Sequence, residues 1–237
     1  MWIFILFLVI IFAGGVFTGI QTWFMLDRLT RENVLNGALI VLFTFTLMMI
    51  AYVMGFLPQS IAAPIMMGIY TLIAGFFTGY SVRMFRYRSR SGTILYQHRS
   101  FWIDHAPNFL SVILILYGLY RTGLLTDQVM TGIRITSGVS IISIGIFMWT
   151  LKAVPEFRSY GVLLLDRWIH WKYVISWHWS SETVITIEYV ANKNKEGNRI
   201  RQFSTAVPDD ERKEIETVLT SKMEEFEEDR RKILFPE

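Results

Sequence analysis

Histidine, arginine and acidic side chains that lie close together in the sequence are the first candidates for chemistry. His98, Arg99, Asp104 and His105 fall within eight residues. Two histidines and a carboxylate could bind a divalent metal ion or support acid–base catalysis. Their spacing follows no helical period that would place them on one face, so we expect neither a metal site nor a catalytic centre here.

Other forms of catalysis lack their usual residues. The chain has no cysteine, which excludes a thiolate metal site and a cysteine nucleophile. No phosphate-binding loop and no nucleophile–base pair can be recognised in the sequence. We therefore predict a protein that is not an enzyme, with no catalytic residue, no metal and no cofactor.

A cluster of arginines alternates with aromatic residues in the segment 83–90. Such a segment beside an apolar run suits the anionic headgroups of the cytoplasmic leaflet, at about 1 kcal/mol per basic residue. A simpler interpretation is that these arginines only set membrane topology and extend from the helix end to the interface. The predicted headgroup contacts are Arg83, Arg86, Arg88 and Arg90.

Long apolar runs indicate the elements that must position these residues. Of the 237 residues, 52% are hydrophobic, and a helix needs roughly 20 apolar residues to cross a hydrocarbon core of about 30 Å. We expect about five transmembrane helices, the first a retained helix because no basic segment precedes it as in a signal peptide. The expected spans are 2–25, 36–57, 61–82, 108–125 and 135–151.

The distribution of charge predicts the orientation of these spans. Residues 1–154 contain 10 basic and 4 acidic residues (+6), whereas residues 155–237 contain 13 basic and 16 acidic residues (−3). The basic excess in the membrane half argues against nucleic-acid binding. Because cytoplasmic loops are rich in arginine and lysine, we expect a cell-membrane protein with an outside N-terminus and a cytoplasmic C-terminal domain.

Two expected spans share a Gly-x-x-x-Gly pattern. Gly15 and Gly19 lie in the first, and Gly75 and Gly79 lie in the third. Small residues four apart let two helix backbones approach closely. We predict that these glycines form helix-packing faces within the chain, with dimerisation as the alternative.

The sequence changes character near residue 155. Short β-type runs at 160–167, 168–179, 183–190 and 199–206 precede a helical run at 209–232 with an apolar stripe. Tryptophans in the first two runs are either core residues or a surface for a partner. These candidates are Trp168, Trp171, Trp177 and Trp179.

Residues 157–163 read FRSYGVL and residues 169–179 read IHWKYVISWHW. With the acidic helix that follows, residues 156–232 resemble the small pleckstrin-homology-like (PH-like) domains of bacterial polytopic membrane proteins of unknown function. The resemblance implies a transmembrane region at 1–154 and a cytoplasmic α+β domain at 155–237, with antiparallel strands followed by a helix. It carries over no catalytic residues.

Two functions follow from this organisation. The first is a non-enzymatic scaffold, regulatory or accessory subunit whose domain binds a protein partner or the membrane surface, with lipids and a second copy of the chain as further partners. The second is a transporter or channel subunit, one that could confer resistance or immunity to a toxic compound. That function requires a polar pathway, for which Thr44, Thr46, Ser111 and Ser140 are the candidates.

Overall fold

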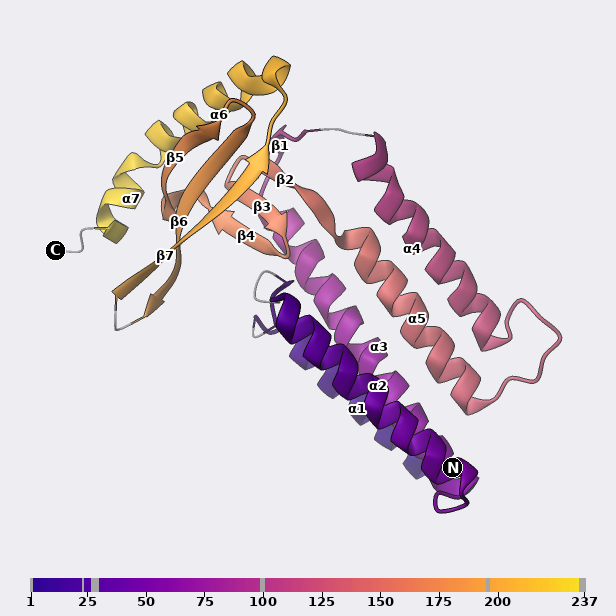
Figure 1. Cartoon of the computed structure of the whole chain (residues 1–237). Coiled ribbons are helices and arrows are strands. Elements are labelled where there is room, and N and C mark those ends of the chain that lie inside the picture. Colours follow the sequence, from indigo (N-terminus) through magenta and orange to yellow (C-terminus); the bar gives the residue numbers. More distant parts are fainter. Residues whose placement is uncertain (1, 23, 27–29, 99–100, 195–196, 235–237) are drawn as a thin grey trace. The chain divides into compact units, whose positions relative to one another are not determined.

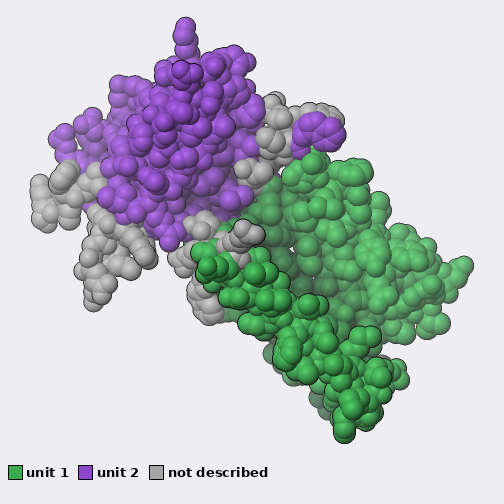
Figure 2. Space-filling model, in the orientation of Figure 1, with its two compact units in different colours: residues 1–85, 105–151 green, residues 86–104, 152–237 purple. Residues whose placement is uncertain are grey.

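A computed structural model describes residues 2–22, 24–26, 30–98, 101–194 and 197–234 (Figure 1). The chain divides into two compact units (Figure 2). The first unit contains residues 1–85 and 105–151, and the second contains residues 86–104 and 152–237. The second unit therefore includes a segment that the sequence placed in a loop between two spans.

Five long helices account for the apolar runs. They are α1 (Trp2–Ile20), α2 (Arg31–Val53), α3 (Gln59–Arg90), α4 (Phe101–Thr122) and α5 (Gly132–Thr150). Among the described residues, α1, α2, α3 and α5 are long and apolar enough to cross a membrane, as expected for a multi-pass membrane protein. In α4, His105, Asn108 and Arg121 lie near the two ends. Its apolar stretch is therefore shorter, and its crossing stays a prediction.

The arginine-rich segment is helical, and its prediction as a loop was wrong. Helix α3 continues through Arg90, and the chain turns at Gly92, which has a φ of +81°. No glycine or proline interrupts residues 83–90, so nothing in this segment opposes the helix. Arg83, Arg86, Arg88 and Arg90, which follow the expected span 61–82, therefore lie on the last turns of a helix.

The first unit is held together by close helix contacts at small residues. A Cβ atom built on Gly15 would lie 2.7 Å from the carbonyl oxygen of Leu72 in α3. The same atom on Gly75 or Gly79 would collide with the backbone of α1 at Phe12 or Val16. All four predicted glycines thus lie where α1 crosses α3, within one chain.

Helices α4 and α5 form a second close pair. A Cβ atom on Gly138 would lie 2.7 Å from the carbonyl oxygen of Gly118. The hydroxyl of Ser111 donates to the carbonyl oxygen of Gly145 at 2.6 Å. Such approaches need small residues, because larger side chains would keep the two backbones apart.

The second unit contains two antiparallel sheets. The first has the order β1-β2-β3-β4 and the second has the order β5-β6-β7. Strand β1 comes from the segment between α3 and α4, and it pairs with β2, so that Ile94 is opposite Arg158. The strands are β1 (Ile94–Tyr96), β2 (Lys152–Arg158), β3 (Gly161–Leu165), β4 (Arg167–His170), β5 (Val174–Ser181), β6 (Val184–Asn194) and β7 (Gly197–Ala206).

Two helices complete this unit. Helix α6 (Arg212–Glu225) and helix α7 (Glu227–Leu234) replace the single predicted helix, and they meet at Phe226. Ile215 and Leu219 are fully buried, and Met223 and Phe226 pack against the same core. The apolar stripe of the predicted helix therefore covers the sheets, as expected.

A candidate partner-binding groove

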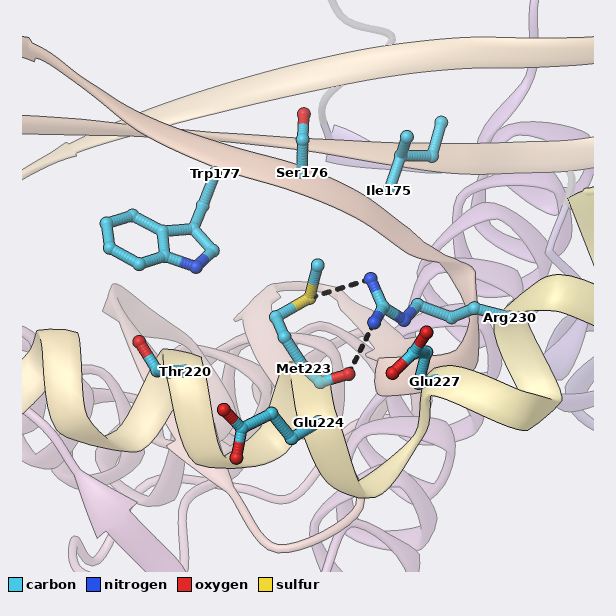
Figure 3. A pocket seen from close by; sticks show the side chains of 8 residues that line it. All are labelled: Ile175, Ser176, Trp177, Thr220, Met223, Glu224, Glu227 and Arg230. Carbon is cyan, nitrogen blue, oxygen red and sulfur yellow. Dashed lines mark hydrogen bonds between the residues drawn. The ribbon is translucent and has the colours of Figure 1, made fainter.

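An open groove of ≈ 410 Å³ lies between strand β5 and helices α6 and α7 (Figure 3). Consecutive residues of β5 form one side, and residues of the two helices form the other. Side chains alternate between the faces of a strand, so three consecutive lining residues mean that the groove follows the edge of β5. The lining residues are Ile175, Ser176, Trp177, Thr220, Met223, Glu224, Glu227 and Arg230.

Trp177 and Met223 form the apolar floor of the groove, and Ile175 is the third apolar residue in its lining. Trp177 projects from β5 toward α6 (Figure 3). Both side chains are partly buried and pack against the core of the unit. Because large aromatic and thioether side chains gain most from full burial, a partner that covered them would gain apolar contact area.

Arg230 fixes the break between α6 and α7. Its guanidinium donates to the carbonyl oxygen of Met223 and contacts the sulfur of the same residue at 3.5 Å (Figure 3). The carbonyl groups in the last turn of a helix lack partners within that helix, and an arginine is well suited to bind them. The Arg230 guanidinium is therefore already hydrogen-bonded to the protein's own backbone.

The remaining charge at the groove is acidic. Glu224 and Glu227 line it from the helix side. The only ion pair of Glu227 among the described residues is with Arg231, at 3.4 Å between two largely exposed side chains. Exposed pairs of this kind contribute little energy, and Glu224 is exposed as well, so both carboxylates are accessible to a basic partner.

Trp179 connects the same strand to α6. Its indole Nε1 donates to Glu216 at 2.8 Å, and the guanidinium of Arg212 lies 4.5 Å from the centre of its ring. Hydrogen bonds from Arg212 and Trp179 lower the pKa of the Glu216 carboxyl. These contacts fix the position of α6 against β5 beside the groove.

The four predicted tryptophans have different environments. Trp171 is fully buried, and its Nε1 donates to the carbonyl oxygen of Arg158 at 2.8 Å. Of the two alternatives predicted for Trp171, the core position is therefore confirmed, and the partner surface is wrong because a partner cannot reach this residue. Trp168 is half-buried beside His170, and only Trp177 of the four lines the groove.

The four predicted lipid-binding arginines also differ. Arg83 is buried, donates to the carbonyl oxygens of Gln21 and Phe24, and lies 4.0 Å from the ring centre of Tyr80. Arg88 is half-buried, whereas Arg86 and Arg90 are exposed. The structure therefore leaves two of the four fully accessible to headgroups.

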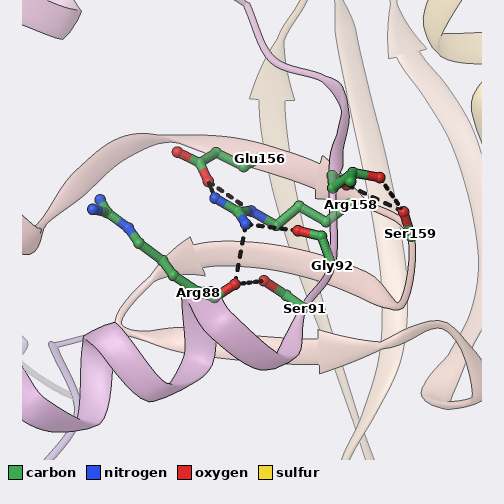
Figure 4. A network of polar contacts seen from close by, with 7 residues as sticks. Arg88, Ser91, Gly92, Glu156, Arg158 and Ser159 are labelled. Carbon is green, nitrogen blue, oxygen red and sulfur yellow. Dashed lines mark hydrogen bonds and ion pairs between the residues drawn. The ribbon is translucent and has the colours of Figure 1, made fainter.

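A buried ion pair near the end of α3 was not predicted from the sequence (Figure 4). The guanidinium of Arg158 contacts the Glu156 carboxylate at 2.6 and 2.8 Å. It also donates to the carbonyl oxygens of Arg88 and Gly92 at 3.2 and 2.9 Å. Glu156 is 1% exposed, so this network joins the end of α3 to β2 through a buried charge.

The four candidate residues for chemistry, His98, Arg99, Asp104 and His105, are divided between the two units. His98, in the second unit, lies 3.2 Å from the Glu211 carboxylate, which also accepts a hydrogen bond from the Tyr96 hydroxyl at 2.5 Å. Burial and the neighbouring Glu211 raise the pKa of the Tyr96 hydroxyl. His105 lies in the first unit, while Arg99 and the side chain of Asp104 lie outside the described residues. Within the described part of the chain, no group of three or more metal-binding side chains is present.

The four residues suggested for a polar pathway are satisfied locally. Thr44 and Thr46 donate to carbonyl oxygens of their own helix, α2, at 2.8 Å. Ser140 does the same in α5, and Ser111 bonds to Gly145 across the α4–α5 contact. Such bonds are typical of structural hydroxyls in membrane helices.

No protein family, curated protein or solved structure matches this chain.

Proposed function

We propose that this chain is a non-enzymatic multi-pass membrane protein whose cytoplasmic, PH-like unit binds a protein partner, as a scaffold, regulatory or accessory subunit. The observation that carries the proposal is the open groove between β5 and α6–α7. It combines an apolar floor at Trp177 with accessible carboxylates at its border. Interfaces are commonly built around a large aromatic side chain surrounded by polar groups.

The connectivity of the chain supports five membrane spans, with the whole second unit on one side of the membrane. This unit takes residues from both sides of the α4–α5 segment, so the chain leaves it at residue 104 and returns at residue 152. If α5 crosses the membrane, α4 must cross it in the opposite direction. The excess of basic residues near the span ends supports a cytoplasmic location for the unit.

The distribution of arginines favours a protein partner over the membrane surface. Electrostatic binding to anionic lipids uses clusters of about four to eight basic residues. Arg83 is buried and engaged with backbone carbonyls, and Arg86 and Arg90 are the fully exposed members of the cluster. The acidic border of the groove would also be repelled by an anionic membrane.

Photocrosslinking in cells that make the protein naturally tests this proposal. A photoreactive phenylalanine analogue replaces Thr220, which is exposed and lines the groove. The matched control places the same analogue at His178, an exposed residue next to Trp177 on β5 that does not line the groove. We expect a discrete protein adduct from position 220 that is absent from position 178.

Substitution of the groove's aromatic residue completes the test. Trp177→Ala in the Thr220-substituted protein should remove the adduct without changing the amount of protein in the membrane. Adducts that form equally at both positions, or adducts to lipid alone, would contradict a protein-binding groove.

A further inference from the structure

We infer that the groove binds an extended, basic peptide segment of its partner, which pairs with β5 as an additional strand. This inference rests on the proposed function and specifies the chemistry of the partner. It follows from three features of the groove: a free strand edge, an apolar floor and an acidic border.

Strand β5 is at the edge of its sheet. In the described part of the chain it pairs with β6 alone, and no backbone hydrogen bond reaches it from α6 or α7. Its eight residues span roughly 26 Å at about 3.3 Å per residue. An edge strand presents backbone N–H and C=O groups that another extended segment can pair with.

The groove leaves this edge accessible over part of its length. Ile175, Ser176 and Trp177 line the open space, whereas Trp179 is occupied by its contacts with Glu216 and Arg212. An added segment would therefore pair with the first half of β5. A helical partner would leave the backbone groups of this edge unpaired once water is excluded, which makes an extended partner more favourable.

The side chains around the edge define the composition of the segment. Alternate residues of an added strand point to opposite sides. Those directed toward α6 would meet Trp177 and Met223, and they should be apolar. Residues near the helix border would meet Glu224 and Glu227, while the one base in the lining, Arg230, is bound to Met223. Charge complementarity thus favours lysine or arginine over aspartate or glutamate.

Selection from a random peptide library tests the inference with the intact protein. Twelve-residue peptides displayed on phage are selected on the full-length chain in nanodiscs of zwitterionic lipid, after removal of phage that bind empty nanodiscs. We expect the selected pool to be enriched in lysine and arginine, depleted in acids, and depleted in proline at central positions, because proline cannot donate a strand hydrogen bond.

Matched variants locate the binding. Fluorescence anisotropy of a selected peptide should show affinity at least about tenfold weaker for Trp177→Ala, because a central aromatic anchor is removed. His178→Ala should bind as the unmodified chain does. Glu224→Gln combined with Glu227→Gln should abolish the preference for basic over neutral peptides.

Three results would overturn the inference. They are a selected pool without basic enrichment, equal tolerance of central proline, and no selected peptide that distinguishes Trp177→Ala from the unmodified chain. The photocrosslinking result is independent of these outcomes. A protein adduct at position 220 together with a failed peptide selection would retain the proposed function and refute the extended segment.

Discussion

The crossing of α1 and α3 allows a direct test with two neighbouring glycines. A methyl group on Gly15 would lie 2.7 Å from the carbonyl oxygen of Leu72 and 2.9 Å from the amide nitrogen of Phe76. On Gly14 the same methyl group would meet nothing within 4 Å. Both contacts at Gly15 are to backbone atoms, so the clash can be relieved only if the helices separate.

The magnitude follows from comparing the two alanine variants. Alanine gains about 0.8–1 kcal/mol over glycine in helix propensity, and this gain applies to both positions. Overpacking of a close contact costs about 1–3 kcal/mol, and this cost applies to Gly15 alone. We therefore expect Gly15→Ala to have an unfolding free energy about 1–3 kcal/mol below that of Gly14→Ala.

Reversible unfolding by SDS titration in detergent micelles, followed by circular dichroism, measures this difference. Equal unfolding free energies for the two variants would refute the close α1–α3 contact. Sedimentation of the same variants in detergent distinguishes helix packing within one chain from assembly of several chains. If Gly15→Ala changed the oligomeric state and left the stability of the single chain unaltered, the glycines would form an intermolecular face instead.

Three further predictions concern the second unit, each measured by urea unfolding in detergent with tryptophan fluorescence. Arg158→Met should lower the unfolding free energy by about 3–5 kcal/mol because it removes the hydrogen-bonded partner of the buried Glu156, which keeps only its electrostatic attraction to Arg88. Adding Glu156→Met should recover most of this loss, and no recovery would refute the pairing of Glu156 with Arg158. Burial and Lys172 lower the pKa of His170, so the contribution of neutral His170 to the unfolding free energy is complete above about pH 6.5 and is lost as the pH falls. His170→Gln should reduce the pH dependence of the unfolding free energy, and an unchanged pH profile would contradict the lowered pKa. Trp171→Ala should cost about 3–5 kcal/mol, and a cost below about 1 kcal/mol would be incompatible with its complete burial.

The sequence predicted the long helices well because their signal is local. A run of about 20 apolar residues is itself sufficient to indicate a spanning helix. The end of α3 was mispredicted because the expected span was ended at residue 82, before the first arginine, and the residues that follow were left in a loop. Arginine is a good helix former, and the first residue that requires a turn is Gly92.

Strands β1 and β2 were missed for reasons that are not local. Strand β1 has three residues, and its partner lies beyond α4 and α5 in the sequence. Strand β2 contains Pro155, a residue that usually argues against a strand. The β2–β3 register shifts between Lys152 and Glu156, and this irregularity accommodates the proline.

The groove could be predicted only in part. The alternation of Trp177 and Trp179 with His178 predicts that the two tryptophans share one face of β5, and the structure places His178 at the surface. The stripe of α6 predicts that this helix packs on the sheet. The groove is also lined by α7, which begins after the break at Phe226, and the sequence provides no proline or glycine signal for that break.

The pairing of β1 with β2 constrains the order in which the protein can be completed during synthesis. Tyr96 emerges from the ribosome 62 residues ahead of Arg158, the last residue of β2. At about 5–20 residues per second, β1 waits roughly 3–12 s for its partner while α4 and α5 are made. During that interval its edge and the carbonyl oxygens of Arg88 and Gly92 lack the partners that β2 supplies. Chaperones that act on nascent membrane proteins would encounter an incomplete sheet in this period. A version of the domain that begins at residue 155 would have the converse defect permanently, because β2 would lack β1 and Arg158 would lack the carbonyl oxygens of Arg88 and Gly92.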